Sequence, residues 1–162
     1  MLKEVTEKAL NTHLNAELFS WYLYLSMAAY YEKRNFLGFA KWLKVQAQEE
    51  MGHAMKFFEY IHQAGGQVQL QPIEGPRIDW ESHRDLFNQV LEHEIKVTNS
   101  IDELIELSKN EKDNATFIFL QWFVTEQVEE VSTATLILEK LKLVGDNPNG
   151  LFLLDRELGM RQ

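Results

Sequence analysis

The chain has 162 residues, enough for one domain with a sizeable core, and contains 16 Lys plus Arg, 25 Asp plus Glu and no cysteine. Its formal charge of −9 would be repelled by phosphate backbones and anionic lipids, so neither a nucleic acid nor a membrane is expected as a partner. The lack of cysteine excludes disulfides, thiolate catalysis and cysteine-ligated zinc or iron–sulfur sites.

The first part of the chain indicates a long amphipathic helix. Residues 1–7 have no apolar core behind a basic start, unlike a secretory signal, so a cytoplasmic protein is expected. The longest uncharged apolar stretch, residues 18–31, is shorter than the roughly 18 to 20 residues that cross a bilayer. Apolar residues recur at three-, four- and seven-residue steps from about residue 5 to residue 33, which predicts a helix that Arg34 and Asn35 end.

A second helix and a long connection follow. Residues 36–64 carry the same helical period, and Gly65 and Gly66 are typical of a helix end. The link between the first two helices is short, so we expect them to pack antiparallel. Residues 66–82 contain prolines and show no sustained period, which indicates a long crossover connection.

The last part of the chain predicts three more helices. Two long helices are expected near residues 83–109 and 114–144, and Gly145 would cap the second of them. A short fifth helix is expected at about residues 148–158, with an apolar face that we expect to dock against a partner subunit. The fold class is therefore all-α: one domain over residues 1–162, with a four-helix bundle at about 5–144, one long crossover and a short C-terminal helix.

Each of the four long helices carries a carboxylate in the middle of its own apolar stripe, counting about 100° per residue. These residues are Glu17, Glu50, Glu94 and Glu130, and His53 follows Glu50 by three positions. Each acid lies about halfway along its helix, so antiparallel packing brings all four to one level. An unpaired buried carboxylate costs several kcal/mol, and no Lys or Arg lies on these stripes near that level. Two divalent ions would balance the four charges, and oxygen ligands with one imidazole suit iron or manganese.

Any single one of these acids could instead be a surface residue whose helix face is misjudged. A lone Glu-x-x-His is also a weak signal, because two common residues take that spacing by chance. Four acids at one level make the metal-site interpretation the stronger one. The remaining histidines, at positions 13, 62, 83 and 93, are expected to have ordinary structural roles and not to bind the metal.

Four segments resemble the bacterial and archaeal non-haem ferritins, and the resemblance covers essentially the whole chain. These segments are LNAELFSWYLY at 14–24, QEEMGHA at 48–54, EHE at 92–94 and FLQWFVTEQVEE at 119–130. As a set they are highly specific.

The resemblance implies a dinuclear ferroxidase centre. Glu17, Glu50 and His53 would surround one iron, while Glu94 and Glu130 would hold the other with Glu50 as the bridge. Tyr24 and Gln127 match positions that lie beside the iron ligands in the family.

Three further comparisons with the family refine this expectation. Bacterioferritins and di-iron oxygenases would have His at position 130, so Glu130 favours a ferritin proper. Met51 matches a haem-binding position of bacterioferritins, but non-haem ferritins also carry Met there, and no haem is expected. A third iron site found in some prokaryotic ferritins is matched by Glu49, Glu126 and Glu129, with a solvated helix surface as the alternative.

The resemblance implies iron storage. Fe²⁺ would be oxidised by O₂ or H₂O₂ and deposited as ferric mineral inside a hollow homo-oligomer of twenty-four copies of the chain. A di-iron oxidase acting on an organic substrate would need a second imidazole and a substrate pocket, and neither is visible. A purely structural helical bundle should not hold four acids in its core. A DNA-protecting miniature ferritin is disfavoured because the chain lacks a basic tail and the metal site lies within one subunit.

Overall fold

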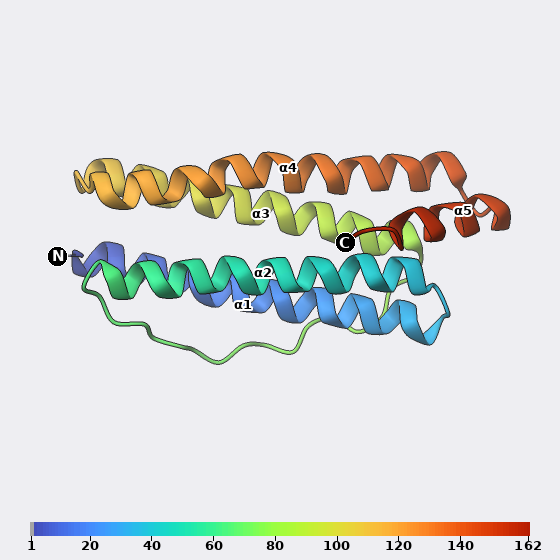
Figure 1. Ribbon diagram of the computed structural model, residues 1–162, viewed down its shortest axis with the longest axis horizontal. Helices are drawn as coiled ribbons and strands as arrows, with labels where there is room; N and C mark the ends of the chain where they lie inside the picture. The colour runs from blue at the N-terminus through green and yellow to red at the C-terminus, as the bar shows by residue number, and fades with distance from the viewer. Residues whose placement is uncertain (1) are drawn as a thin grey trace.

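Five helices and their connections make up residues 2–162, the part of the chain that this computed structural model describes (Figure 1). The helices are α1 Glu4–Lys33, α2 Leu37–Gln63, α3 His83–Asn110, α4 Asn114–Val144 and α5 Pro148–Leu158. The α1–α2 pair forms one layer and the α3–α4 pair the other, and the connection from α2 to α3 runs along the outside of the first layer. The predicted four-helix bundle with one long crossover and a short fifth helix is confirmed. Within the described range, no helix is both long and apolar enough to cross a membrane.

Local sequence signals account for most of the helix ends. Asn35 takes a left-handed φ of 62° in the turn between α1 and α2, and Gly145 ends α4 with a φ of 58°, as predicted. The side chain of Ser82 accepts a hydrogen bond from the backbone N–H of residue 85 and caps α3, while Asp113 and Asn147 cap α4 and α5 in the same way. These five helix ends therefore follow from residues at the ends themselves.

The core of the bundle is divided into two apolar halves by a polar layer. The half nearer the α1–α2 turn includes Tyr31 and Phe39, and the opposite half includes Leu10 and Phe57, all fully buried. Between these halves, at the middle of the four long helices, lie buried polar side chains: Glu17, Gln46, Glu50, His53, Glu94, Gln127 and Glu130. Apolar packing on both sides thus encloses the layer in which the predicted metal ligands lie.

The crossover connection is held against α1 by two asparagines. Asn11 donates from Nδ2 to the carbonyl of Gln67 and accepts from the N–H of Gln69. One turn further along α1, Asn15 pairs in the same way with the carbonyl of Gln69 and the N–H of Gln71. These side chains satisfy backbone groups that have no helix or strand partner.

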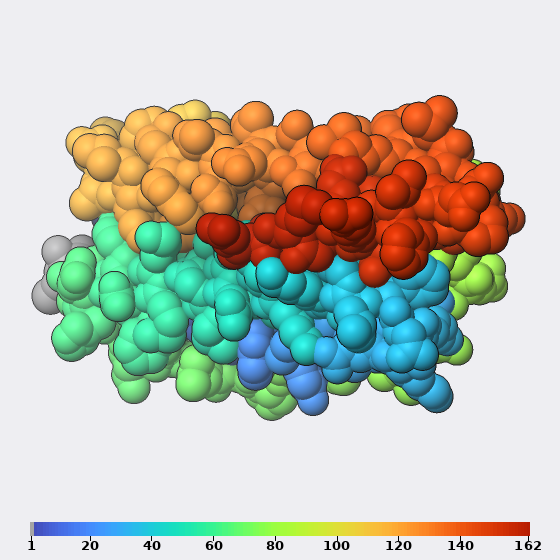
Figure 2. Space-filling model, turned by 45° about the vertical axis from the view of Figure 1, so that its right-hand side comes forward, coloured from blue at the N-terminus to red at the C-terminus, as the bar shows by residue number. Residues whose placement is uncertain are grey.

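Helix α5 departs from its predicted role, because its own subunit covers much of it. Leu154 and Leu158 are buried in the core, where α5 packs against α2 and α4, while Phe152 and Leu153 remain exposed. Figure 2 shows the C-terminal segment lying along the boundary between α2 and α4. The prediction that the apolar face of α5 docks against a partner is therefore wrong for Leu154. The ends of α2 and α4 leave an apolar surface that this helix covers.

A close backbone approach fixes the position of α5. The side chain of Asp155 accepts hydrogen bonds from the N–H groups of Gly38, at 2.9 Å, and Phe39, at 3.0 Å, at the start of α2. A Cβ atom on Gly38 would lie 1.6 Å from the carbonyl oxygen of Asp155, so only glycine allows this contact. Asp155, inside α5, thus caps the start of α2, whose own N-cap residue provides no side-chain cap.

Candidate metal centre

Five side chains from all four long helices meet in the polar layer. Glu17 comes from α1, Glu50 and His53 from α2, Glu94 from α3 and Glu130 from α4, and none is more than 7% exposed. Ligand atoms of Glu17, Glu50 and His53 lie within 4.8 Å of one another. The same holds for Glu50, Glu94 and Glu130. The two groups share Glu50. The structure therefore brings together the residues that were predicted to surround two metal ions.

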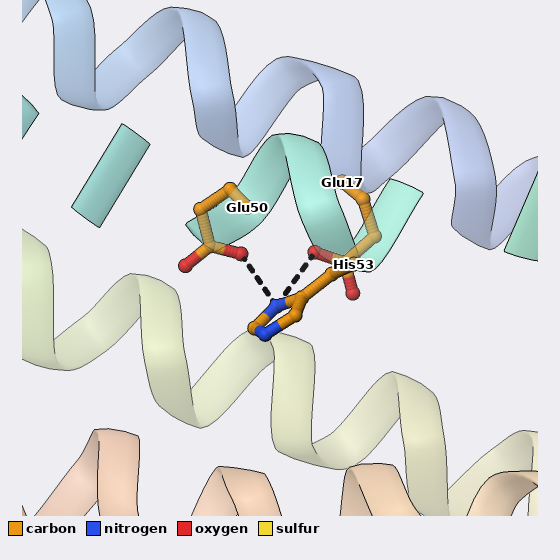
Figure 3. A group of neighbouring side chains, drawn as sticks. All are labelled: Glu17, Glu50 and His53. Carbon is orange, nitrogen blue, oxygen red and sulfur yellow. Dashed lines mark hydrogen bonds and ion pairs between the residues drawn. The ribbon is translucent and has the colours of Figure 1, made fainter. Parts of the chain in front are cut away.

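The first group contains a carboxylate oxygen that accepts no hydrogen bond from the described part of the chain and has only a long ion pair with His53 (Figure 3). His53 donates from Nδ1 to Oε2 of Glu50 over 3.1 Å, and the same nitrogen lies 3.8 Å from Oε2 of Glu17. Within residues 2–162, this Glu17 oxygen is buried and has no hydrogen-bond partner, whereas Oε1 is bonded to His13 at 2.8 Å. A buried acceptor facing a second carboxylate is costly in protein alone, and a cation would satisfy it.

The second group is held by donors from neighbouring helices. The hydroxyl of Tyr24 donates to Oε1 of Glu94, and Nε2 of Gln127 lies 3.2 Å from Oε2 of the same carboxylate. Both donors are buried, Tyr24 completely. Tyr24 and Gln127 thus lie beside the ligands, as the family resemblance implies, and they fix the orientation of one carboxylate.

Two further contacts to the centre were missed at the sequence level. Gln46 donates from Nε2 to Oε1 of Glu50 over 2.9 Å and to Oε2 of Glu130 over 2.8 Å. His13, which was expected to have an ordinary role, is bonded to Glu17. In both cases the new residue precedes a predicted ligand by four positions, a spacing that places two side chains on one helix face. That spacing was the available signal.

Burial and crowding shift the pKa values of the centre. Burial raises the pKa of both Glu50 and Glu94 to about 8 and that of Glu130 to about 7, and the neighbouring carboxylates add to the effect. Burial lowers the pKa of His53, but its hydrogen bond and charge interaction with Glu50 outweigh this effect and bring the value to about 9. Burial also opposes ionisation of Glu17, yet contacts with His13 hold its pKa below the usual range. The metal-free centre therefore retains protons near neutral pH that cations would displace.

The residues matched to a third iron site lie at the edge of the centre. Glu49 forms an ion pair with Arg161 at 2.5 Å, and Glu129 is exposed. In the described part of the chain, neither belongs to a group of three ligand residues within 4.8 Å. Glu126 lies closer, with Oε1 3.8 Å from Nε2 of His53. These two residues and Glu130 form a group of three ligand residues. The ion pair also places a positive charge nearer the centre than expected.

The remaining histidines lie outside these groups. His62 is exposed, and the ring of His83 stacks on Tyr31. His93 lies 2.7 Å from the hydroxyl of Ser20 through Nε2, and burial lowers its pKa to about 4, which keeps the imidazole neutral at pH 7. These contacts are structural.

Comparison with known proteins decides the family. Residues 7–144 match the family model described as the ferritin-like domain. The chain belongs to the ferritin family. It is 43% identical over 161 residues to a bacterial non-heme ferritin of Bacteroides fragilis, covering 99% of this chain and 100% of the relative. A bacterial non-heme ferritin of Staphylococcus aureus is 38% identical, covering 99% of this chain and 97% of the relative.

Solved ferritins have the same fold. The chain superposes on an open-pore ferritin of the hyperthermophilic archaeon Archaeoglobus fulgidus with a TM-score of 0.99 and 48% identity, covering 100% of both chains. An engineered closed form of that ferritin gives the same TM-score and identity. The ferritin bundle, including the position of α5 at its end, is thus shared over the full length of the chain.

Proposed function

We propose that this ferritin stores iron and oxidises Fe²⁺ at a dinuclear centre within each subunit. One iron is bound by Glu17, Glu50 and His53, and the other by Glu94, Glu130 and the bridging Glu50. Membership of the ferritin family supports iron storage and metal binding. The two ligand groups that share one carboxylate support the assignment of residues.

The observation that carries this proposal is that the buried Oε2 of Glu17 accepts no hydrogen bond from residues 2–162. Each of the other carboxylates of the centre accepts at least one hydrogen bond, but within that range this oxygen is buried without one, and its ion-pair partner, Nδ1 of His53, lies 3.8 Å away. Buried polar atoms are rarely left in this state. A cation placed between Glu17, Glu50 and His53 would compensate the oxygen and relieve the crowding of negative charge.

The same ligand set accounts for the reaction. Carboxylates stabilise Fe³⁺ more than Fe²⁺, which lowers the cost of removing an electron. Two ions side by side supply two electrons together, so that 2 Fe²⁺ + O₂ + 2 H⁺ give 2 Fe³⁺ + H₂O₂. With peroxide as oxidant, 2 Fe²⁺ + H₂O₂ + 2 H⁺ give 2 Fe³⁺ + 2 H₂O. Tyr24 and Gln127 keep Glu94 oriented as the metal charge changes.

Storage requires that the product leaves the centre and accumulates. In this proposal, Fe³⁺ moves inward to form a mineral inside a hollow homo-oligomer of twenty-four subunits, and Glu49, Glu126 and Glu129 provide a third iron site beside the first two. The fold shared over full length with other ferritins supports a common assembly. The group formed by His53, Glu126 and Glu130 supports metal binding at that edge of the centre.

Two measurements test the proposal. Fe²⁺ is added anaerobically to metal-free protein, air is admitted, and ferric absorbance is followed against a buffer blank, with Glu139→Ala on the exposed face of α4 as the control variant. Oxidation no faster than in buffer would remove the ferroxidase assignment. Gel filtration of the product then reports the assembly, and elution at the monomer mass of 19.0 kDa would exclude storage, because a cavity needs a shell.

A further inference from the structure

The C-terminal end of the chain reaches the edge of the metal centre. Arg161, which follows α5, donates from Nη1 to Oε1 of Gln46 over 2.9 Å and to the carbonyl of Trp42 over 3.3 Å. Its other terminal nitrogen, Nη2, donates to Oε2 of Glu49 over 2.5 Å, and the guanidinium lies 4.4 Å from the centre of the Trp42 ring. In Figure 2 this segment lies along the boundary between α2 and α4. Three residues of α2 therefore hold one guanidinium.

Hydrogen-bond chemistry determines how the Gln46 amide must be oriented. A guanidinium can only donate, whereas an ionised carboxylate can only accept. Because Arg161 takes the amide oxygen, the NH₂ group of Gln46 points at the centre, where it donates to Oε1 of Glu50 and Oε2 of Glu130. Gln46 is 1% exposed, so water does not offer it alternative partners. Without Arg161, the amide oxygen would lose its donor, and the amide could turn away from one or both acids.

We propose that Arg161 is a positioning residue for the dinuclear centre, acting through the amide of Gln46 to hold Glu50 and Glu130. This inference rests on the proposed function for the identity of the centre. Gln46 holds one oxygen of each carboxylate, while the other oxygen of Glu50 is bonded to His53. The two carboxylates belong to different helix pairs, α2 and α4, so the amide also sets their separation before metal binds.

Anaerobic titration with Co²⁺, followed by its d–d absorption and by calorimetry, measures this role without turnover. Gln46→Leu is expected to weaken binding at the centre about tenfold, the lower end of the usual effect of losing a group that orients a metal ligand. Arg161→Gln is expected to weaken Co²⁺ binding by a smaller factor. Arg161→Lys should resemble Arg161→Gln, because a single ammonium does not reproduce the fork that joins Gln46 and Glu49. The double variant should bind no more weakly than Gln46→Leu alone, because Arg161 acts through Gln46.

A matched control removes another contact of the C-terminal helix. Glu157→Gln breaks the exposed ion pair between Glu157 and Lys140 without touching Gln46, so wild-type Co²⁺ binding is expected. Unfolding temperatures of all variants separate loss of positioning from loss of folding. Wild-type affinity and d–d spectrum in Arg161→Gln, or losses that add in the double variant, would overturn the proposal.

A crystal structure of metal-free Arg161→Gln gives a second, independent readout. The Gln46 amide is expected to leave at least one of Glu50 and Glu130, and an unchanged Gln46 with both hydrogen bonds in place would overturn the positioning role. This result does not depend on which ion the centre takes. If the wild-type chain bound no Co²⁺ at all, the proposed function would fail, while the crystal structure would still decide whether Arg161 orients the two carboxylates.

Discussion

His13 donates a hydrogen bond from Nε2 to Oε1 of Glu17 over 2.8 Å, and both side chains are at least 98% buried. The other ring nitrogen, Nδ1, lies 2.8 Å from the hydroxyl of Ser100 on α3, so the imidazole is held on both sides. One carboxylate oxygen of Glu17 is thereby hydrogen-bonded to protein, and the other, which accepts no hydrogen bond from the residues that the structure describes, lies 3.8 Å from Nδ1 of His53. An imidazole behind a carboxylate ligand orients that ligand for the metal.

Replacing this imidazole tests its contribution. In His13→Leu, Oε1 of Glu17 would lose its donor, so metal-free protein should be destabilised by about 1–3 kcal/mol. Metal affinity at the first ion should fall about tenfold, because the carboxylate is no longer oriented. Thermal unfolding and anaerobic calorimetric titration measure the two effects. His62→Leu, at an exposed position of α2, is the control, and indistinguishable results for the two variants would contradict the role of His13.

Removal of a ligand should separate chemistry from folding. Glu50→Ala and Glu130→Ala are each expected to abolish fast ferrous oxidation. Glu50→Ala removes the ligand that both ions share, and Glu130→Ala removes one ligand of the ion bound by Glu50 and Glu94. Their helical circular dichroism should match the wild type, since each change also relieves charge crowding among buried acids. Stopped-flow ferric absorbance measures the rate. Wild-type rates in both variants would refute the site assignment.

The pKa shifts predict how the metal-free protein responds to pH. Glu50 and Glu94 have folded pKa values of about 8 against 4.5, and His53 about 9 against 6.5, so the native state binds more protons than the unfolded chain over those ranges. Stability therefore falls as pH rises through them. His93, with a pKa of about 4 against 6.5, acts in the opposite direction, but only below pH 6.5.

The clearest window lies between pH 6.5 and pH 8, where the raised pKa values of the centre, those of Glu50, Glu94 and His53, act in the same direction. The unfolding temperature of metal-free protein should fall across this window, and addition of Co²⁺ should reduce the fall because bound metal replaces the protons. Calorimetry in buffers of different ionisation enthalpy should show proton release on metal binding at pH 7. Binding with no proton release at that pH would contradict the raised pKa values of Glu50 and Glu94.

The sequence was sufficient for the features that depend on helical periodicity. Each of the four acids could be placed at the middle of a helix because a period of 3.6 residues fixes which positions face inward, and the structure brings them together. His13 and Gln46 were missed because inward-facing polar residues near a predicted ligand give no sign of which atom they contact. Arg161 was missed for a different reason. Its place at Gln46 depends on how α5 folds back, which no local pattern specifies.

The helix α5 itself offers a test of that packing. Asp155 supplies the acceptor for two N–H groups at the start of α2, where the local N-cap residue, Phe36, provides none. Asp155→Ala should therefore lower the free energy of unfolding by about 1 kcal/mol, the usual effect of losing a helix cap. Asp155→Asn retains an oxygen acceptor, so its free energy of unfolding should fall much less. Equal unfolding free energies for Asp155→Ala and the wild type, measured in denaturant, would show that α5 docks through its apolar residues alone.

Glu49, Glu126 and Glu129 are the residues matched to a third iron site. In the metal-free arrangement Arg161 neutralises the first of these acids, so a third metal ion would have to replace that guanidinium or bind beside Glu126. If they hold a third iron, replacing all three by Gln should leave the initial two-iron oxidation intact, because the ligands of the dinuclear centre remain.

The ratio of iron oxidised to oxygen consumed should change, together with the rate at which the centre becomes ready for a second addition of Fe²⁺. An oxygen electrode and repeated stopped-flow additions measure these quantities. Gln preserves length and helix propensity, and at position 49 it keeps an oxygen that can accept from Arg161 in this half-buried contact. A change would therefore report lost charge at a metal site. A triple variant with wild-type stoichiometry and recovery would assign these glutamates to the solvated surface of α2 and α4.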